Sequence, residues 1–150
     1  MIDRKLAELG IELPVAPAPA FQYVPVTIHE RLAFVSGQLP RHGEALVTGK
    51  VGTDVDLEHA RDAARLCILQ GLACLNQSLG SLDKVDRILK ITGFVASAPG
   101  FNLQPRVIDA ASELLVQIFG DMGKHARSAV GVAELPRNAA VEIEMIVALR

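Results

Sequence analysis

Residues 124–149 read KHARSAVGVAELPRNAAVEIEMIVAL, and this stretch decides the fold. Two runs rich in β-forming residues, 126–134 and 139–149, flank a Leu-Pro-Arg-Asn turn at 135–138. Strand-like runs on both sides of a turn that contains proline predict two paired strands joined as a hairpin. Both runs are largely apolar, so we expect the hairpin to be mostly buried.

Three charged side chains interrupt this apolar stretch. Arg127 opens the first run, and Glu142 and Glu144 lie among Val, Ile and Met in the second. Buried charges require partners, so an Arg and a Glu on one hairpin indicate a recessed polar site. Arg127 then has two interpretations: a planar fork that binds the carboxylate of a ligand, or one half of a structural ion pair with Glu142 or Glu144.

Upstream of this stretch, strand-like and helix-like patterns follow one another. The first long helix is expected to begin after the N-cap Asp56, to place small residues on one narrow face and to end at Gly80. The other expected elements are strands at 22–27, 31–36 and 85–96, a short strand at 45–47, and a second long helix at 105–119 closed by Gly120. This order predicts an α+β fold in which both long helices cover one face of a single mixed sheet.

The last strand has apolar residues on both of its faces. Strand residues alternate in direction, so one face receives Val141, Ile143 and Met145 and the other receives Glu142, Glu144 and Ile146. Two helices on one side cover only one face of the sheet. We therefore expect the second face to contact another subunit.

The first twenty residues have a different character from the rest. Residues 3–9 predict a short helix that stops at Gly10, and the Pro/Ala run 14–20 predicts an extended linker. Residues 21–150 then form a single domain, a size typical of one domain. In this division, residues 1–20 are a short helix with its linker.

Composition excludes several classes of protein. Half of the residues are hydrophobic and the formal net charge is −2, which argues against a nucleic-acid binder with a basic surface. No apolar run is long enough to cross a bilayer, and the N-terminus lacks a secretory apolar core, so a cytoplasmic location is expected.

Cys67 and Cys74 are seven positions apart on one helix. This spacing separates them by about 10 Å, which is beyond disulfide reach. We expect free thiols, and no metal-ligand cluster is evident.

Two motifs carry a resemblance to a known family. Ala126-Arg127-Ser128, Leu135-Pro136 and Glu142-Ile143-Glu144 match, in order and spacing, the C-terminal motif of the YjgF/RidA family, also called the endoribonuclease L-PSP family. Phe34-Val35-Ser36-Gly37-Gln38-Leu39-Pro40 is similar to the early strand of the same family. The resemblance covers residues 21–150. His125 replaces the proline that precedes the family's Ala-Arg-Ser.

The resemblance implies a fold and a set of site residues. Family members have a chorismate-mutase-like fold and form trimers with sites between subunits. Arg127 stands at the family's carboxylate-binding Arg, and Glu142 at the Glu that holds the attacking water. Substrate contacts are implied for Tyr23, Ser36, Gly37 and Ala129, the last at a position where many members carry Cys. Asp109 falls in the region of a site Asn, although a solvated helix position explains it equally well, and His125 fits a surface residue or a titratable group beside the pocket.

The implied activity is hydrolysis of reactive enamine or imine intermediates, such as 2-iminopropanoate, to 2-keto acids and ammonia, without a cofactor. The partners would be a small imino or keto acid and two further copies of the chain. A non-catalytic trimer that binds a small keto or amino acid is the main alternative. The ribonuclease or translation-inhibitor activity in the family's older name fits less well, because the chain has few aromatic residues and no basic stripe.

Overall fold

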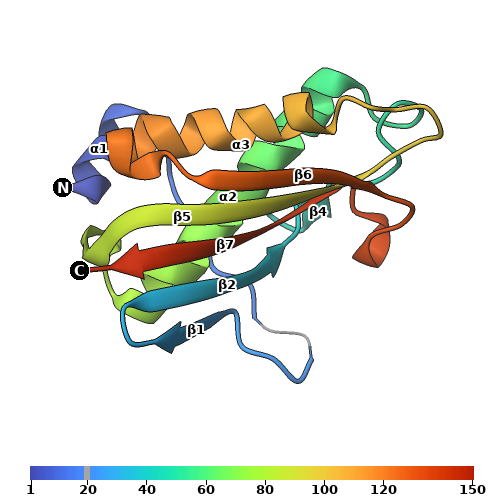
Figure 1. Cartoon of the computed structure of the whole chain (residues 1–150). Helices are drawn as coiled ribbons and strands as arrows, with labels where there is room; N and C mark the ends of the chain where they lie inside the picture. Colours follow the sequence, from blue (N-terminus) through green and yellow to red (C-terminus); the bar gives the residue numbers. More distant parts are fainter. Residues whose placement is uncertain (19–20) are drawn as a thin grey trace.

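The computed structural model describes residues 1–18 and 21–150. Its centre is a five-stranded sheet, and two long helices, α2 (Leu57–Leu79) and α3 (Gln104–Phe119), lie on one face of it (Figure 1). The sheet order is β1-β2-β7-β5-β6, with bounds Val26–His29 (β1), Leu32–Gln38 (β2), Val85–Ala96 (β5), Ala126–Val132 (β6) and Val141–Leu149 (β7). Only β5 and β6 are parallel, so the sheet is mixed, and the predicted α+β layer is confirmed.

The predicted C-terminal hairpin is wrong, because β5 lies between β6 and β7. Arg127 of β6 is paired in parallel with Ile91 of β5, whereas Glu142 of β7 is paired antiparallel with Phe94 of β5. The α3 crossover brings β6 beside β5 in parallel, as a connection of this length permits. The segment after β6, which contains η3 (Pro136–Asn138), then carries the chain across to the other edge of β5.

Helix α2 begins and ends where the sequence predicts. The Asp56 side chain accepts a hydrogen bond from the His59 N–H, and Gly80 adopts the left-handed conformation with φ 82°, which satisfies the two helix ends. A Cβ atom at Gly71 would lie 2.5 Å from Cε of Met145 on β7. The small residues of α2 therefore allow the helix to approach the sheet closely.

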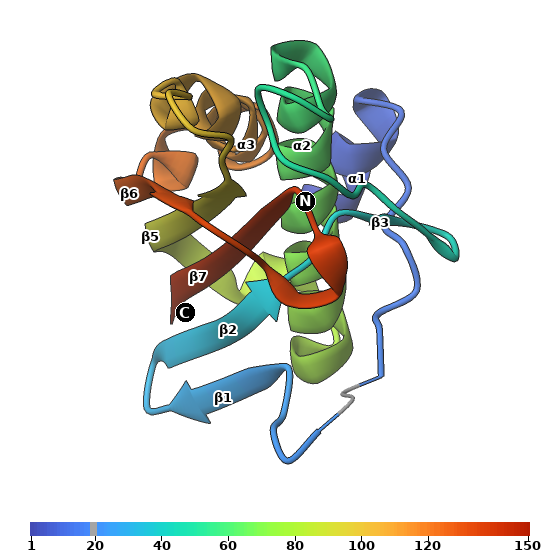
Figure 2. The same cartoon turned by 90° about the vertical axis from the view of Figure 1, so that its right-hand side faces the viewer.

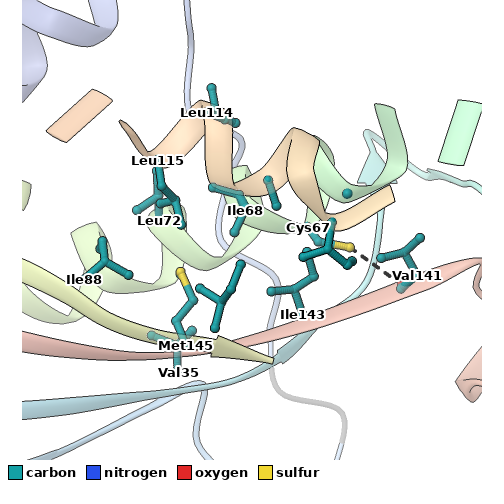
Figure 3. Close-up of a cluster of buried hydrophobic side chains, with 14 of the residues drawn as sticks. Val35, Cys67, Ile68, Leu72, Ile88, Leu114, Leu115, Val141, Ile143 and Met145 are labelled. Atoms are coloured by element: carbon teal, nitrogen blue, oxygen red, sulfur yellow. Dashed lines mark hydrogen bonds between the residues drawn. The ribbon is translucent and has the colours of Figure 1, made fainter. Parts of the chain in front are cut away.

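The core lies between the two long helices and the sheet (Figure 3). The apolar face of α3 is buried in full, with Val107, Ala110, Ala111, Leu114 and Ile118. Cys67 and Cys74 are free and buried, as predicted, and the Cys67 thiol lies 3.6 Å from the Val141 carbonyl. Burial raises the pKa of the Cys67 thiol well above its ordinary value, so this side chain acts as a small core residue.

The opposite face of the sheet is uncovered in the protomer. Phe34, Lys90 and Ile146 form one row across β2, β7 and β5 on this face, and Phe34 is 42% exposed. Val130 on β6, 43% exposed, extends the apolar surface. The prediction that two helices cover only one face is confirmed, and what covers the other face stays a prediction.

The N-terminal segment packs against the helix layer. Helix α1 (Ile2–Glu8) contacts α3 and η1 (Leu82–Lys84), and Leu6 is buried. The chain's amino group forms an ion pair of 3.0 Å with Asp83, whose carboxylate also accepts from the Ile2 N–H at 2.7 Å. Residues 11–18 then run without regular secondary structure (Figure 2); residues 19 and 20 of the predicted linker lie outside the described residues.

The first strands are shifted from their predicted positions. The predicted strand 22–27 is observed as β1 at 26–29, because Pro25 has no N–H to donate to a ladder. The strand predicted at 31–36 extends to Gln38, and the short strand at 45–47 is β4 (Ala45–Leu46), paired with β3 (Arg41–His42). Within residues 1–18 and 21–150, none of the helices combines the length and apolar character that a bilayer crossing demands.

Candidate active site

A hollow of about 920 Å³ opens where the end of β2, the start of β7 and the turn at η3 come together. In Figure 2 this turn (red) lies beside the end of β2. The hollow is lined by four of the residues expected from the sequence: Tyr23, Ser36, Gly37 and Glu142. The other lining residues are Phe21, Leu39, Arg41, Pro136, Arg137 and Glu144.

Glu142 is a carboxyl group in this hollow whose pKa is shifted from its ordinary value. Partial burial raises the pKa of its carboxyl, and the neighbouring charge of Glu144 raises it further. Within the described part of the chain, the Glu142 carboxylate has neither an ion-pair partner nor a hydrogen-bond donor. A carboxylate that is partly desolvated and unpaired is suited to exchange a proton with a bound water.

Gly37 allows the Glu142 side chain to occupy its position. A Cβ atom on Gly37 would lie 2.7 Å from Glu142 Oε1 and 3.0 Å from its Cδ, closer than real side-chain contacts. The pairing of β2 with β7 is irregular between Val35 and Gln38, as in a β-bulge. On either side of Gly37, Ser36 Oγ donates to the Val24 carbonyl at 2.8 Å, and Gln38 Nε2 donates to the Ser36 carbonyl at 3.0 Å.

Two cations in the hollow were not expected from the sequence. Arg41 is the first residue of β3, and Arg137 lies in the η3 turn with φ 58°, a region that residues with a side chain rarely adopt. Neither guanidinium forms an ion pair with a described residue. The sequence held a signal for Arg137, because this residue directly follows the matching Leu135-Pro136. For Arg41 the local sequence held no comparable signal.

Arg127 does not lie in this hollow. It projects from β6 towards the helices, where its Nη1 donates to Asp109 Oδ1 at 2.8 Å and to Ser112 Oγ at 3.2 Å. The alternative pairing with Glu142 or Glu144 is therefore wrong: those side chains leave the sheet on its other face, and β5 separates the strands. Asp109 is correspondingly an ion-pair partner and not a purely solvated helix residue.

The surroundings of Arg127 contain two more residues considered in the sequence. His125 is part-buried, with Nε2 at 2.9 Å from Ser112 Oγ and Nδ1 at 2.6 Å from the Gly123 carbonyl oxygen. Ala129 is two residues beyond Arg127 on β6 and packs against the core. Arg127 and Ala129 thus share one face, whereas Tyr23, Ser36, Gly37 and Glu142 line the hollow elsewhere. Among the residues that the structure describes, no group of three His, Cys, Asp or Glu is arranged for a metal ion.

The comparison with family models assigns the chain to a protein family. Residues 3–149 match the model described as "YjgF/chorismate_mutase-like, putative endoribonuclease". This chain belongs to the YjgF/RidA family. The match begins at residue 3, so the resemblance extends further towards the N-terminus than the motifs alone indicated.

Several YjgF/RidA relatives match almost the whole chain. Protein TCP17 of Trypanosoma cruzi is 43% identical over 150 residues, which cover 99% of this chain and 94% of the relative. A 2-iminobutanoate/2-iminopropanoate deaminase of Dermatophagoides farinae is 32% identical, with coverage of 93% and 94%. The crystal structure of the protein Atu1372 from Agrobacterium tumefaciens is 48% identical with a TM-score of 0.92, covering 99% of this chain and 92% of that one. The last match includes the N-terminal segment.

Proposed function

We propose that this protein hydrolyses reactive enamine and imine intermediates, such as 2-iminopropanoate, to 2-keto acids and ammonia. The observation that carries the proposal is Glu142, a half-buried carboxylate with a raised pKa in a hollow large enough for a small acid. Membership of the YjgF/RidA family, in which one relative is named a deaminase for this class of substrate, supports it.

In the proposed reaction, Glu142 accepts a proton from a water whose oxygen attacks the C=N carbon. The carbon–nitrogen π bond breaks as the new carbon–oxygen bond forms, and Glu142 passes the proton of the water to the nitrogen, which gives a tetrahedral carbinolamine. Glu142 then accepts the proton of the carbinolamine hydroxyl and delivers it to the nitrogen as the carbon–nitrogen bond breaks, so that ammonia leaves and the 2-keto acid remains. Because imines already hydrolyse in water, the protein contributes mainly positioning and electrostatics.

The complete site requires a second protomer in this proposal. Arg127 and Glu142 leave one sheet on opposite faces, so one substrate cannot contact both within a protomer. In a homotrimer, Arg127 of one copy would bind the substrate carboxylate, and Glu142 of the next would hold the water. The uncovered sheet face, with Phe34 and Val130 exposed, supports an assembly of this kind.

The test is release of ammonia from 2-iminopropanoate generated in place by an amino-acid oxidase. We expect the intact protein to accelerate formation of the 2-keto acid above the spontaneous rate. Glu142→Gln should lose this acceleration while it retains affinity for pyruvate, because the amide cannot take the proton. An equal rate with and without the protein would contradict the proposal.

One observation favours a second candidate, a trimer that binds a keto or amino acid without catalysis. Asp109 already occupies one side of Arg127, and its charge reduces the attraction of the guanidinium for a substrate carboxylate. Saturable binding of pyruvate in calorimetry, together with no acceleration of imine hydrolysis, would support this candidate. Cleavage of a single-stranded RNA that Glu142→Gln abolishes would instead support a nuclease.

A further inference from the structure

A network of four side chains surrounds Arg127 on the helix side of the sheet. Asp109 and Ser112 stand three positions apart on α3, so both lie on the helix face that looks towards β6. Both contact the same guanidinium nitrogen, Nη1, at 2.8 Å and 3.2 Å. His125 contacts Ser112 from the other side.

With a neutral imidazole at His125, one assignment of hydrogens satisfies every group of this network. A guanidinium can only donate, so Ser112 Oγ accepts from Arg127 and its own hydrogen is available for His125 Nε2. That nitrogen then accepts, and the proton of a neutral imidazole resides on Nδ1, which donates to the Gly123 carbonyl. The histidine therefore orients the serine hydroxyl, and the serine orients the arginine.

The contacts use both Nη1 hydrogens and leave the rest of the guanidinium open. Among the described residues, Nε and Nη2 of Arg127 have no hydrogen-bond partner. These two nitrogens form one edge of the planar group, with two parallel N–H bonds that match a single carboxylate. The arrangement therefore presents one fork, in one plane, to a ligand.

We propose that Asp109 and Ser112 are positioning residues that hold Arg127 so that its Nε/Nη2 edge receives the carboxylate of the substrate. This inference rests on the proposed function of Arg127 and adds the groups through which it acts. Asp109 has a second, opposing effect, because its negative charge weakens the attraction for a carboxylate. Any test must separate orientation from charge.

Two substitutions at Asp109 make that separation. Asp109→Asn and Asp109→Ala both remove the charge, but only the amide oxygen still accepts the Nη1 hydrogen bond. The ratio of their affinities for pyruvate, measured by calorimetry on the assembled protein, therefore reports orientation alone. We expect Asp109→Ala to bind pyruvate about 3- to 10-fold more weakly than Asp109→Asn, because a freed arginine must be ordered again on binding.

Pyruvamide, which lacks the carboxylate, is the matched control ligand. The two variants should bind it with equal affinity, whereas a general loosening of the site would weaken both ligands alike. Equal pyruvate affinities for the two variants, or an equal loss with pyruvamide, would overturn the inference. If either Asp109 variant fails to assemble, Ser112→Ala compared with Ser112→Thr asks the same question, since only threonine keeps the hydroxyl that accepts from Nη1.

Arg127→Ala distinguishes this inference from the proposed function. If Arg127→Ala loses pyruvate binding while Asp109→Asn and Asp109→Ala bind pyruvate equally well, only the positioning role is overturned. Pyruvate binding that survives Arg127→Ala would remove both, because Arg127 would then not be the carboxylate ligand.

Discussion

Arg127 and Glu142 lie on opposite faces of the same sheet, with β5 between the strands that carry them. Arg127 is held against α3 by Asp109, and Glu142 faces the hollow beside Gly37. A ligand that contacts both groups must therefore contact two copies of the chain.

The first prediction is a complementation test of that arrangement. Arg127→Ala and Glu142→Gln should each be inactive alone. When the two variants are mixed, unfolded together and refolded, about a quarter of the interfaces in a random cyclic trimer join an intact Arg127 to an intact Glu142. We expect a corresponding fraction of wild-type deaminase activity, whereas a site within one protomer would recover none. Sedimentation equilibrium provides the control, because a 16.0 kDa species at micromolar concentration would contradict the trimer.

The second prediction concerns the shape of the cation at position 127. Arg127→Ala should abolish imine hydrolysis and pyruvate binding while the protein stays folded. Arg127→Lys should also lose most of its activity, about 10-fold or more, because a point charge replaces neither the two-pronged fork nor the paired bonds to Asp109 and Ser112. Steady-state rates with circular dichroism as the folding control measure this. Unchanged turnover in Arg127→Ala would show that Arg127 has no part in the reaction, and unchanged turnover in Arg127→Lys would show that a point charge suffices.

The third prediction follows from the short distance between Gly37 and Glu142. Gly37→Ala places a methyl group 2.7 Å from Glu142 Oε1, so the carboxylate must move. Turnover should fall roughly 10- to 100-fold, the cost of misplacing a reacting group by about 1 Å. The backbone at Gly37 is not in the positive-φ region, so the fold and the assembly should persist. A variant with wild-type turnover would show that the position of Glu142 is unimportant.

The fourth prediction is a dependence of stability on pH. Burial is the larger cause of the raised pKa of Glu142 in the folded state, and the charge of Glu144 is the smaller cause. A carboxyl group with a raised folded pKa favours folding at low pH, and this contribution is lost as the pH rises through that pKa. Glu142→Gln should therefore stabilise the protein at pH 7, by roughly 0.5 kcal/mol because the side chain is only half-buried. Thermal melts at pH 4 should show no such gain; equal gains at both pH values would contradict the origin in ionisation.

The fifth prediction tests the division of the chain at residue 20. Removal of residues 1–18 should leave the assembly and the basic turnover intact. It should lower the free energy of unfolding by about 2 kcal/mol, since the buried Leu6 is lost. Pro17 and Ala18 lie beside Tyr23 and Arg41, so turnover of bulkier imino acids should increase. A truncated protein that is insoluble or monomeric would show that the segment belongs to the core or the interface.

Local chemistry accounts for the parts of the molecule that the sequence predicts well. Asp56 and Gly80 bound α2 because a cap and a left-handed residue act on their own helix ends. The apolar residues of α3 share one face because they recur with the helical repeat, and the two thiols are kept apart by the rise of the helix. The grouping of Tyr23, Ser36, Gly37 and Glu142 came from the family motif, whose spacing preserves a three-dimensional arrangement that no single segment displays.

Strand pairing and the faces of side chains depend on contacts between distant segments. A Pro-containing turn between two apolar runs is compatible with a hairpin, and nothing within 124–149 indicates that β5 separates them. In the sheet, β5 pairs with β6 on one edge and with β7 on the other. That insertion, together with the strand alternation, places Arg127 beside Asp109 and places Glu142 on the other face, where it has no ion-pair partner among residues 1–18 and 21–150. The sequence thus identified the charged residues, and only the tertiary structure decided which of them meet, because pairing energy depends on neighbours that lie far away in the chain.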